Sequence, residues 1–344
     1  MKEVTLRNVG LDVHKETITA GVADRDGQPL IDSTIANDPG AIRKLMQRLG
    51  RDVELKVAYE AGPTGYALHR QLTEMGISCV VGAPSLVPKR PGDRVKTDGR
   101  DALTLARLLR SGDLVPIRVP TPQEEALRDL VRSRMDVKAD LLRAKHHLSK
   151  FLLRHGLRAP VGAKAWSARC NAWLNQISLE QPAAQVVLED YRAAVRAAEE
   201  RLRQLEIALE RCAQTSSQLA LISALQALRG IAFLSAVTIV AEAGDLRRFA
   251  SAREFMAYTG LVPSEHSSGQ SRRRGSITHT GNSNIRHILV QAAHNARYAP
   301  QIRSVLKRRL EGMPAELVDI SWKASSACTL AIAISVLASV APRP

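Results

Sequence analysis

The first 118 residues alternate between short β-rich runs and amphipathic helical runs, and this alternation restricts the fold more than any other feature of the chain. Three β-rich runs come first, and strands then alternate with helices. Such an order predicts a mixed α/β sheet with helices packed on it. We expect strands at 8–14, 17–24, 29–36, 53–61 and 77–84, and helices at 40–50, 65–76 and 97–112.

The chain becomes helical and densely charged after residue 118. Two long helical stretches are joined by the Gly/Pro/Trp-containing segment 156–182, and one of them carries an apolar stripe close to heptad spacing. This pattern predicts an antiparallel hairpin that acts as a scaffold or dimerisation arm. The stretches run from Pro122 to about His155 and from about Ala183 to Cys212. We therefore predict an α/β plus all-α protein, with an α/β domain at 1–118, a helical arm at 119–229 and a mostly helical domain at 230–344.

The balance of charge indicates the kind of partner. The chain has 49 Lys and Arg residues against 34 Asp and Glu residues, a net charge of +15. Such an excess is typical of a protein that meets a polyanion, above all nucleic acid, although a solvated basic surface is the alternative. The four cysteines have no zinc-binding spacing and are interpreted as reduced thiols of a cytosolic protein. Residues 324–341 are apolar but too rich in serine for a membrane span, so no membrane partner is expected.

Four acidic residues lie on predicted strands or in the first turn of a predicted helix, where the fold could bring their side chains together. Asp12 interrupts an apolar strand, where an uncompensated carboxylate is costly, and Glu60 closes the fourth strand. Asp98 and Asp101 are three residues apart and share one face of the following helix. If the first and fourth strands are neighbours, the four carboxylates converge and need a cation, for which hard oxygen ligands select Mg²⁺ or Mn²⁺. The alternative is that Asp98 and Asp101 serve only the helix dipole, and His14 is interpreted as a polar strand-end residue.

The acidic residues lie in sequence blocks that resemble a known family. VGLDVHK (9–15), YEAGPTGY (59–66) and VKTDGRDALTLARLL (95–109) resemble the catalytic blocks of the DEDD transposases of the insertion-sequence-110 family. The segment 258–286 resembles that family's C-terminal transposase domain, and the resemblance extends over about residues 5–323. It implies a ribonuclease H-like first domain, similar to the RuvC resolvase, and a coiled-coil arm. It also puts Asp12, Glu60, Asp98 and Asp101 on the family's four catalytic, metal-binding positions.

A second set of candidate residues lies in the segment 264–286, where three adjacent arginines are interleaved with glycines. By composition this segment is either a loop that approaches phosphate closely or a flexible, solvated basic loop. The resemblance implies that Ser268 is the nucleophile that forms a phosphoserine link to DNA, with Ser267 as the alternative. We predict that the nucleic acid contacts Arg272, Arg273, Arg274, Lys96 and Arg100.

These features support one leading function and two alternatives. The leading function is a Mg²⁺-dependent transposase that moves its own insertion sequence by serine-linked strand exchange. The resemblance implies double-stranded donor and target DNA, a structured guide RNA, and a dimer or tetramer associated with the nucleoid in a prokaryotic cytoplasm. The aromatic content of 3% argues against broad base-stacking platforms. The alternatives are a structure-selective nuclease of the resolvase kind, which uses only carboxylates and water, and a non-catalytic nucleic-acid-binding protein.

Two further segments allow two interpretations each. Residues 225–249 predict two short helices around a turn at Gly230, either a phosphate-binding helix-hairpin-helix or an αα corner. After Lys323 the resemblance to the family stops. Residues 324–344 contain one basic and no acidic residue, which predicts either a frameshifted reading frame or an apolar helix specific to this lineage.

Overall fold

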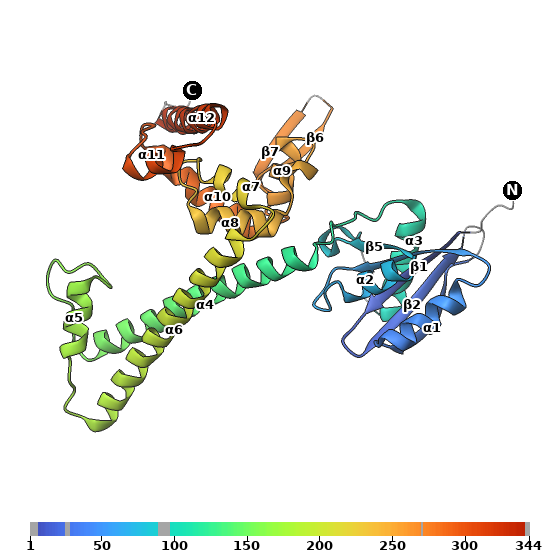
Figure 1. Ribbon diagram of the computed structural model, residues 1–344, viewed down its shortest axis with the longest axis horizontal. Coiled ribbons are helices and arrows are strands. Elements are labelled where there is room, and N and C mark those ends of the chain that lie inside the picture. Colours follow the sequence, from blue (N-terminus) through green and yellow to red (C-terminus); the bar gives the residue numbers. More distant parts are fainter. Residues whose placement is uncertain (1–5, 25–27, 89–96, 270, 341–344) are drawn as a thin grey trace. The chain divides into compact units, whose positions relative to one another are not determined.

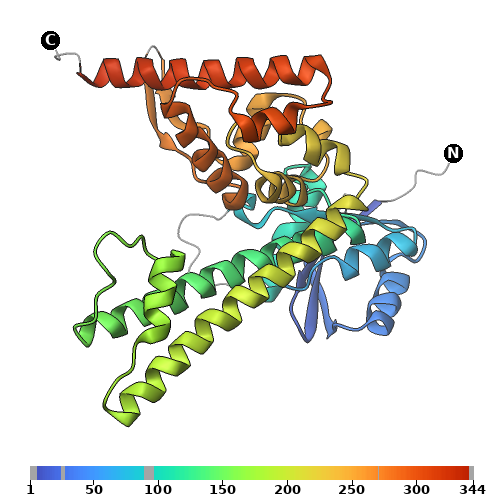
Figure 2. The same cartoon turned by 60° about the vertical axis from the view of Figure 1, so that its left-hand side comes forward.

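The structure, a computed structural model, describes residues 6–24, 28–88, 97–269 and 271–340, with the side chains of Arg272 and of 328–340 outside that description. The chain divides into two units, Met1–Val119 and Pro120–Pro344 (Figure 1, Figure 2). The predicted helical arm and C-terminal domain thus lie in one unit. A boundary between residues 229 and 230 stays a prediction.

The first unit is built on one five-stranded mixed sheet with the order β3-β2-β1-β4-β5. Strands β1, β2 and β3 form an antiparallel meander, while β4 pairs in parallel with β1 and with β5. The predicted mixed sheet is confirmed, and its first and fourth strands are neighbours, in keeping with the ribonuclease H-like expectation. The strands are β1 Leu6–Val13, β2 Thr17–Asp24, β3 Leu30–Ala36, β4 Glu54–Glu60 and β5 Ser78–Gly82.

Helices cover both faces of this sheet. Leu11 and Tyr59 point into a core that also contains apolar side chains of α1 (Pro39–Leu49) and α2 (Ala67–Glu74). The other face carries α3 (Asp98–Ser111), which lies close to the strands because Gly10 has no side chain. A Cβ atom on Gly10 would be 2.1 Å from the carbonyl oxygen of Ala102. The glycine therefore lets α3, with its acidic first turn, approach β1 closely.

The second unit begins with two long paired helices, α4 (Pro122–Arg154) and α6 (Pro182–Gln214) (Figure 1, Figure 2). Val131 near the start of α4 packs in one core with Leu209 near the end of α6, so the pair is antiparallel, as predicted. The connecting segment contains one helix that the sequence analysis did not expect, α5 (Ala168–Gln176). It starts where the Ser167 hydroxyl accepts a hydrogen bond from the backbone N–H of Cys170.

The rest of the second unit is a helical domain with a small hairpin. Its helices are α7 Leu219–Leu225, α8 Phe233–Ala243, α9 Ala252–Thr259, α10 Ser283–Ala293, α11 Ser304–Leu310 and α12 Ala315–Val340. Strands β6 (Pro263–Ser268) and β7 (Ser271–Ile277) form an antiparallel hairpin. The prediction of a basic loop is therefore wrong for 263–277. Polar side chains occupy consecutive positions along both strands, so the alternation of apolar and polar residues that marks a half-buried strand is missing from the sequence.

The turn at Gly230 is explained by packing. Gly230 has a φ of 88°, and a Cβ atom there would be 2.8 Å from the Asn295 side-chain nitrogen and 2.9 Å from the Ala292 carbonyl oxygen. This close contact favours the αα corner over the phosphate-binding turn. Helix α12 runs through the atypical tail as far as Val340, which agrees with the helical alternative for that segment. Within the described residues, no helix is both long and apolar enough to cross a membrane.

Candidate active site: an acidic cluster and a serine hairpin

The sheet topology brings the two strand-borne carboxylates to neighbouring positions. Leu11 pairs with Tyr59 in the parallel register of β1 and β4, so Asp12 and Glu60 are the next residues on adjacent strands. Because side chains alternate along a strand, both carboxylates belong to the face that α3 covers, opposite the core that holds Leu11 and Tyr59.

Asp98 comes to the same place from the first turn of α3. Thr97 caps this helix by accepting a hydrogen bond from the backbone N–H of Arg100, and Asp98 and Asp101 are the acidic residues of the first turn. His14 lies between the strand and the helix, with its Nε2 3.3 Å from Asp12 Oδ2 and 3.4 Å from Asp98 Oδ1. Asp12, His14 and Asp98 offer ligand atoms that all lie within 4.8 Å of one another.

His14 lies directly after the end of β1, as interpreted from the sequence, and it also belongs to the group of three possible ligand residues. Its backbone N–H donates a 2.8 Å hydrogen bond to the carbonyl oxygen of Thr17, and this tight turn between β1 and β2 holds the imidazole beside Asp12. The signal in the sequence was the spacing: a histidine two residues after the strand acid, at the end of the same strand.

The surroundings of Asp12 disfavour the ionised form of its carboxyl group and raise its pKa. Partial burial raises the pKa of the Asp12 carboxyl, the negative charges of Asp101 and Asp98 raise it further, and His14 opposes this rise. Asp101 therefore acts on Asp12 although it lies outside the group of three ligand residues. Glu60 is half-buried and also lies outside that group.

The donor set fits a divalent cation. Its oxygen atoms come from carboxylates, the ligands that Mg²⁺ and Mn²⁺ prefer. A cation would also neutralise the like charges that raise the pKa of Asp12. The side chain of Asp98 is 58% exposed and that of Asp12 is 21% exposed, so a substrate oxygen has access to the cluster.

The β6–β7 hairpin separates the two candidate serines onto opposite faces. The Ser267 hydroxyl donates a 2.8 Å hydrogen bond to Glu265 Oε1, and Arg274 Nε is 3.6 Å from Glu265 Oε2. Glu265, Ser267 and Arg274 therefore share one face, which agrees with the pairing of Glu265 with Arg274.

Ser268 belongs to the other face of the hairpin. Side chains alternate along β6 from Glu265 to Ser268, so His266 and Ser268 lie on the face opposite Glu265 and Ser267. Arg273 pairs directly with His266 and thus shares their face. All three side chains, those of His266, Ser268 and Arg273, are exposed.

A buried carboxylate fixes the base of this hairpin. The side chain of Glu242 in α8 is 1% exposed and accepts two hydrogen bonds from the guanidinium of Arg132 in α4, at 2.8 and 2.9 Å. Asn282 and Asn284 each donate a 2.8 Å hydrogen bond to the same carboxylate. Asn282 is the N-cap of α10 and lies five residues after the end of β7. Glu242 therefore connects the segment that follows the hairpin to helices α4 and α8.

Burial raises the pKa of Glu242, but the hydrogen bonds from Arg132, Asn282 and Asn284 outweigh it and hold that pKa below its usual value. The sequence analysis overlooked Glu242. The signal was present, because Glu242 interrupts the apolar run Thr238–Ala243 just as Asp12 interrupts β1.

The structure describes only some of the residues that are predicted to contact nucleic acid. Arg100 is exposed in the first turn of α3, two residues after Asp98. Lys96 and the side chain of Arg272 lie outside the described part of the chain.

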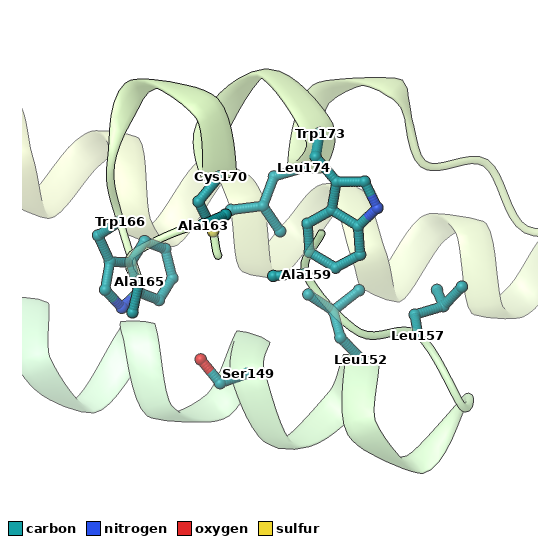
Figure 3. A pocket seen from close by; sticks show the side chains of 10 residues that line it. All are labelled: Ser149, Leu152, Leu157, Ala159, Ala163, Ala165, Trp166, Cys170, Trp173 and Leu174. Atoms are coloured by element: carbon teal, nitrogen blue, oxygen red, sulfur yellow. The ribbon is translucent and has the colours of Figure 1, made fainter. Parts of the chain in front are cut away.

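A separate cavity of about 210 Å³ lies between the end of α4, the following connector and α5 (Figure 3). Its lining is mostly alanine, leucine and tryptophan, including Trp166 and Trp173, and it contains no charged side chain. It offers no group suited to phosphodiester chemistry.

Comparisons with known proteins identify transposase families over most of the chain. Residues 9–156 match a family model described as a transposase of the DEDD type, and residues 222–307 match the transposase IS116/IS110/IS902 family. A putative transposase of Sinorhizobium fredii, y4qE, is 39% identical over 324 residues, which cover 93% of this chain and 80% of the relative. The transposase for insertion sequence element IS1533 of Leptospira borgpetersenii is 30% identical and covers 92% and 93% of the two chains.

Proposed function

This chain belongs to the IS116/IS110/IS902 family of transposases, and on that premise we propose that it excises and integrates an insertion sequence by metal-dependent, serine-mediated strand exchange. The observation that carries the proposal is the cluster of Asp12, His14 and Asp98, whose possible ligand atoms all lie within 4.8 Å of one another. A site of this composition suits phosphodiester chemistry on DNA.

Asp12, Glu60, Asp98 and Asp101 are the residues that would hold Mg²⁺, or Mn²⁺ in its place. The bound ion supplies charge neutralisation at the phosphodiester and makes a hydroxyl easier to deprotonate. Asp12 and Glu60 come from adjacent strands and Asp98 and Asp101 from one helix turn, so rigid elements carry all four.

Ser268 is the proposed nucleophile. Its Oγ forms a bond to phosphorus, and one phosphorus–oxygen bond of the DNA backbone breaks. The hydroxyl proton passes to solvent, and the departing sugar oxygen takes up a proton, so one DNA end stays linked to the protein as a phosphoserine ester. Both serines are exposed, but the Ser267 hydroxyl donates to the Glu265 carboxylate, whereas Ser268 lies on the opposite face of the hairpin, and this difference supports Ser268 over Ser267.

The partners follow from charge and family. The net charge of +15 supports binding to double-stranded donor and target DNA and to a structured guide RNA, with Arg272, Arg273, Arg274, Lys96 and Arg100 as backbone contacts. Joining two DNA partners needs at least a dimer, for which α4 and α6 form a coiled-coil arm, and a tetramer is the larger alternative. The proposed location is the nucleoid of a prokaryotic cytoplasm.

A transposition assay in a surrogate bacterial host tests the function. The chain and a plasmid carrying the element with its flanking sequences are introduced together, and excision and insertion junctions are counted by sequencing. We expect junctions with the natural chain and a loss of at least a hundredfold with Asp12→Asn.

The matched control is Glu16→Gln, an exposed acidic residue near the cluster that pairs with Lys15 at 3.1 Å. This variant should keep the natural junction frequency. Full activity of Asp12→Asn would contradict the proposal.

A further inference from the structure

We propose that Arg273, rather than its neighbour Arg274, contacts the phosphate that Ser268 attacks, which makes it a catalytic residue. The inference rests on the proposed function and deepens it. In the sequence Arg272, Arg273 and Arg274 are equivalent members of one basic run.

The hairpin register separates Arg273 from Arg274. Arg273 pairs with His266, which by alternation along β6 lies on the same face as Ser268. Ser268 pairs with Ser271, two residues before Arg273 on β7, so Arg273 is the diagonal neighbour of Ser268 across the hairpin. Long side chains at such diagonal positions are within reach of each other.

Arg274 lies beside a carboxylate on the other face of the hairpin. It pairs with Glu265 in the register, and its Nε is 3.6 Å from that carboxylate, which also accepts the hydrogen bond of Ser267. A phosphodiester is an anion, so the carboxylate on this face repels it. Glu265 is the only acidic residue in the sequence from Pro263 to Ile277, so the hairpin itself contributes a hydroxyl and a cation, but no carboxylate, to the Ser268 face.

The proposed role is electrostatic. When Ser268 Oγ bonds to phosphorus and before the sugar oxygen departs, negative charge grows on the two non-bridging oxygens. A guanidinium presents several N–H donors in a planar fork that matches these two oxygens. Donors aimed at developing charge commonly contribute about 10²- to 10³-fold in rate.

The test removes either the positive charge of the arginine, by substitution, or the negative charge of the scissile phosphate, by a neutral linkage. Purified full-length chain is incubated with Mg²⁺, the RNA transcribed from the element flank and a duplex carrying the element end. Covalent protein–DNA adduct is then measured on a denaturing gel. One duplex has the natural scissile phosphate, as mapped with the natural chain, and a second has a neutral methylphosphonate at that linkage.

On the natural duplex, Arg273→Ala should slow adduct formation by about 10²- to 10³-fold, whereas Arg274→Ala, which removes a proposed backbone contact on the other face of the hairpin, should slow it by less than about tenfold, and by the same factor on both duplexes. On the methylphosphonate duplex, whose scissile linkage carries one negative charge fewer to neutralise, Arg273→Ala should recover to within about tenfold of the natural chain. A merely structural role for Arg273 would give no such recovery.

Three results would overturn the inference. Arg273→Ala could form adduct normally on the natural duplex, it could lose activity equally on both duplexes, or Arg274→Ala could be the variant that the neutral linkage rescues. Each of these leaves the proposed function intact, because the natural chain still forms adduct. Absence of adduct with the natural chain would instead contradict the serine mechanism, and the role of Arg273 with it.

Discussion

Ser267 and Ser268 are adjacent in the sequence but have opposite electrostatic surroundings. The Ser267 hydroxyl donates to a carboxylate, whereas Ser268 shares its face with His266 and Arg273. The alternation of side chains along β6 produces this difference, since it turns neighbouring residues to opposite faces. A nucleophile for an anionic phosphate needs the second environment.

Glu265→Gln tests this difference directly. The substitution removes a negative charge that repels DNA, so affinity for duplex DNA should rise about twofold to fivefold at low salt, in line with the small energies of exposed charge pairs. Binding is measured by fluorescence anisotropy, and adduct formation on the natural duplex should persist. If the variant bound DNA and formed no adduct, Glu265 would be the base for a Ser267 nucleophile, and the assignment of Ser268 would be wrong.

At the scale of elements, the closeness of α3 to the sheet sets the geometry of the acidic cluster. A Cβ atom at Gly10 would be 2.1 Å from the Ala102 carbonyl oxygen and 2.4 Å from the Ala106 nitrogen, so α3 must shift to admit any side chain. Gly10→Ala should lower the free energy of unfolding of the first unit by about 1–3 kcal/mol. Calorimetric Mn²⁺ titration should also show weaker binding, because Asp98 and Asp101 move with α3.

Gly62→Ala is the control for that experiment. The nearest atom to a Cβ there is the Glu60 carbonyl oxygen at 3.9 Å, an ordinary contact, so its stability should equal that of the natural chain. Unchanged stability and Mn²⁺ binding in Gly10→Ala would show that α3 does not position the cluster.

The Glu242 network gives a prediction on pH. Because the folded pKa of Glu242 lies below its usual value of 4.5, its stabilising contribution is present above pH 4.5 and is lost as the pH falls through the folded pKa. Glu242→Gln should therefore lower the free energy of unfolding of the second unit at pH 7, and the difference from the natural chain should shrink on acidification. Denaturant unfolding between pH 7 and pH 3 measures both values. A difference that stayed constant over this range would contradict the ionised network.

Most elements of the first unit are predictable from the sequence, because apolar residues with a clear period mark β1 and α1. The β6–β7 hairpin and α5 escape prediction for a physical reason. The hairpin has polar side chains on both faces, and α5 lies in a segment that glycine, proline and tryptophan make look irregular. Residue patterns single out Asp12 and Glu60 as acids within or at the end of strands, but they do not give the contact of His14 with Asp98, which depends on how closely α3 packs.

At the scale of the whole molecule, the net charge of +15 should make the affinity for DNA depend strongly on the salt concentration. Each phosphate contact releases counterions, so a protein with about six to ten such contacts loses about 10³- to 10⁵-fold in affinity between 50 and 200 mM salt. We expect a slope in this range for a duplex of unrelated sequence, measured by fluorescence anisotropy. An affinity independent of salt would contradict the assignment of the arginines to the nucleic-acid backbone.

A covalent-trapping experiment can establish whether the acidic cluster and Ser268 serve one reaction, as we propose. The natural chain, Asp12→Asn, Ser268→Ala and Ser267→Ala are each incubated with Mg²⁺, element-end duplex and flank RNA, and resolved on a denaturing gel. We predict a DNA-linked protein band with the natural chain and with Ser267→Ala, and its loss in both Asp12→Asn and Ser268→Ala. DNA cleavage that survives Ser268→Ala but not Asp12→Asn would contradict this prediction and identify a metal-dependent nuclease that uses water.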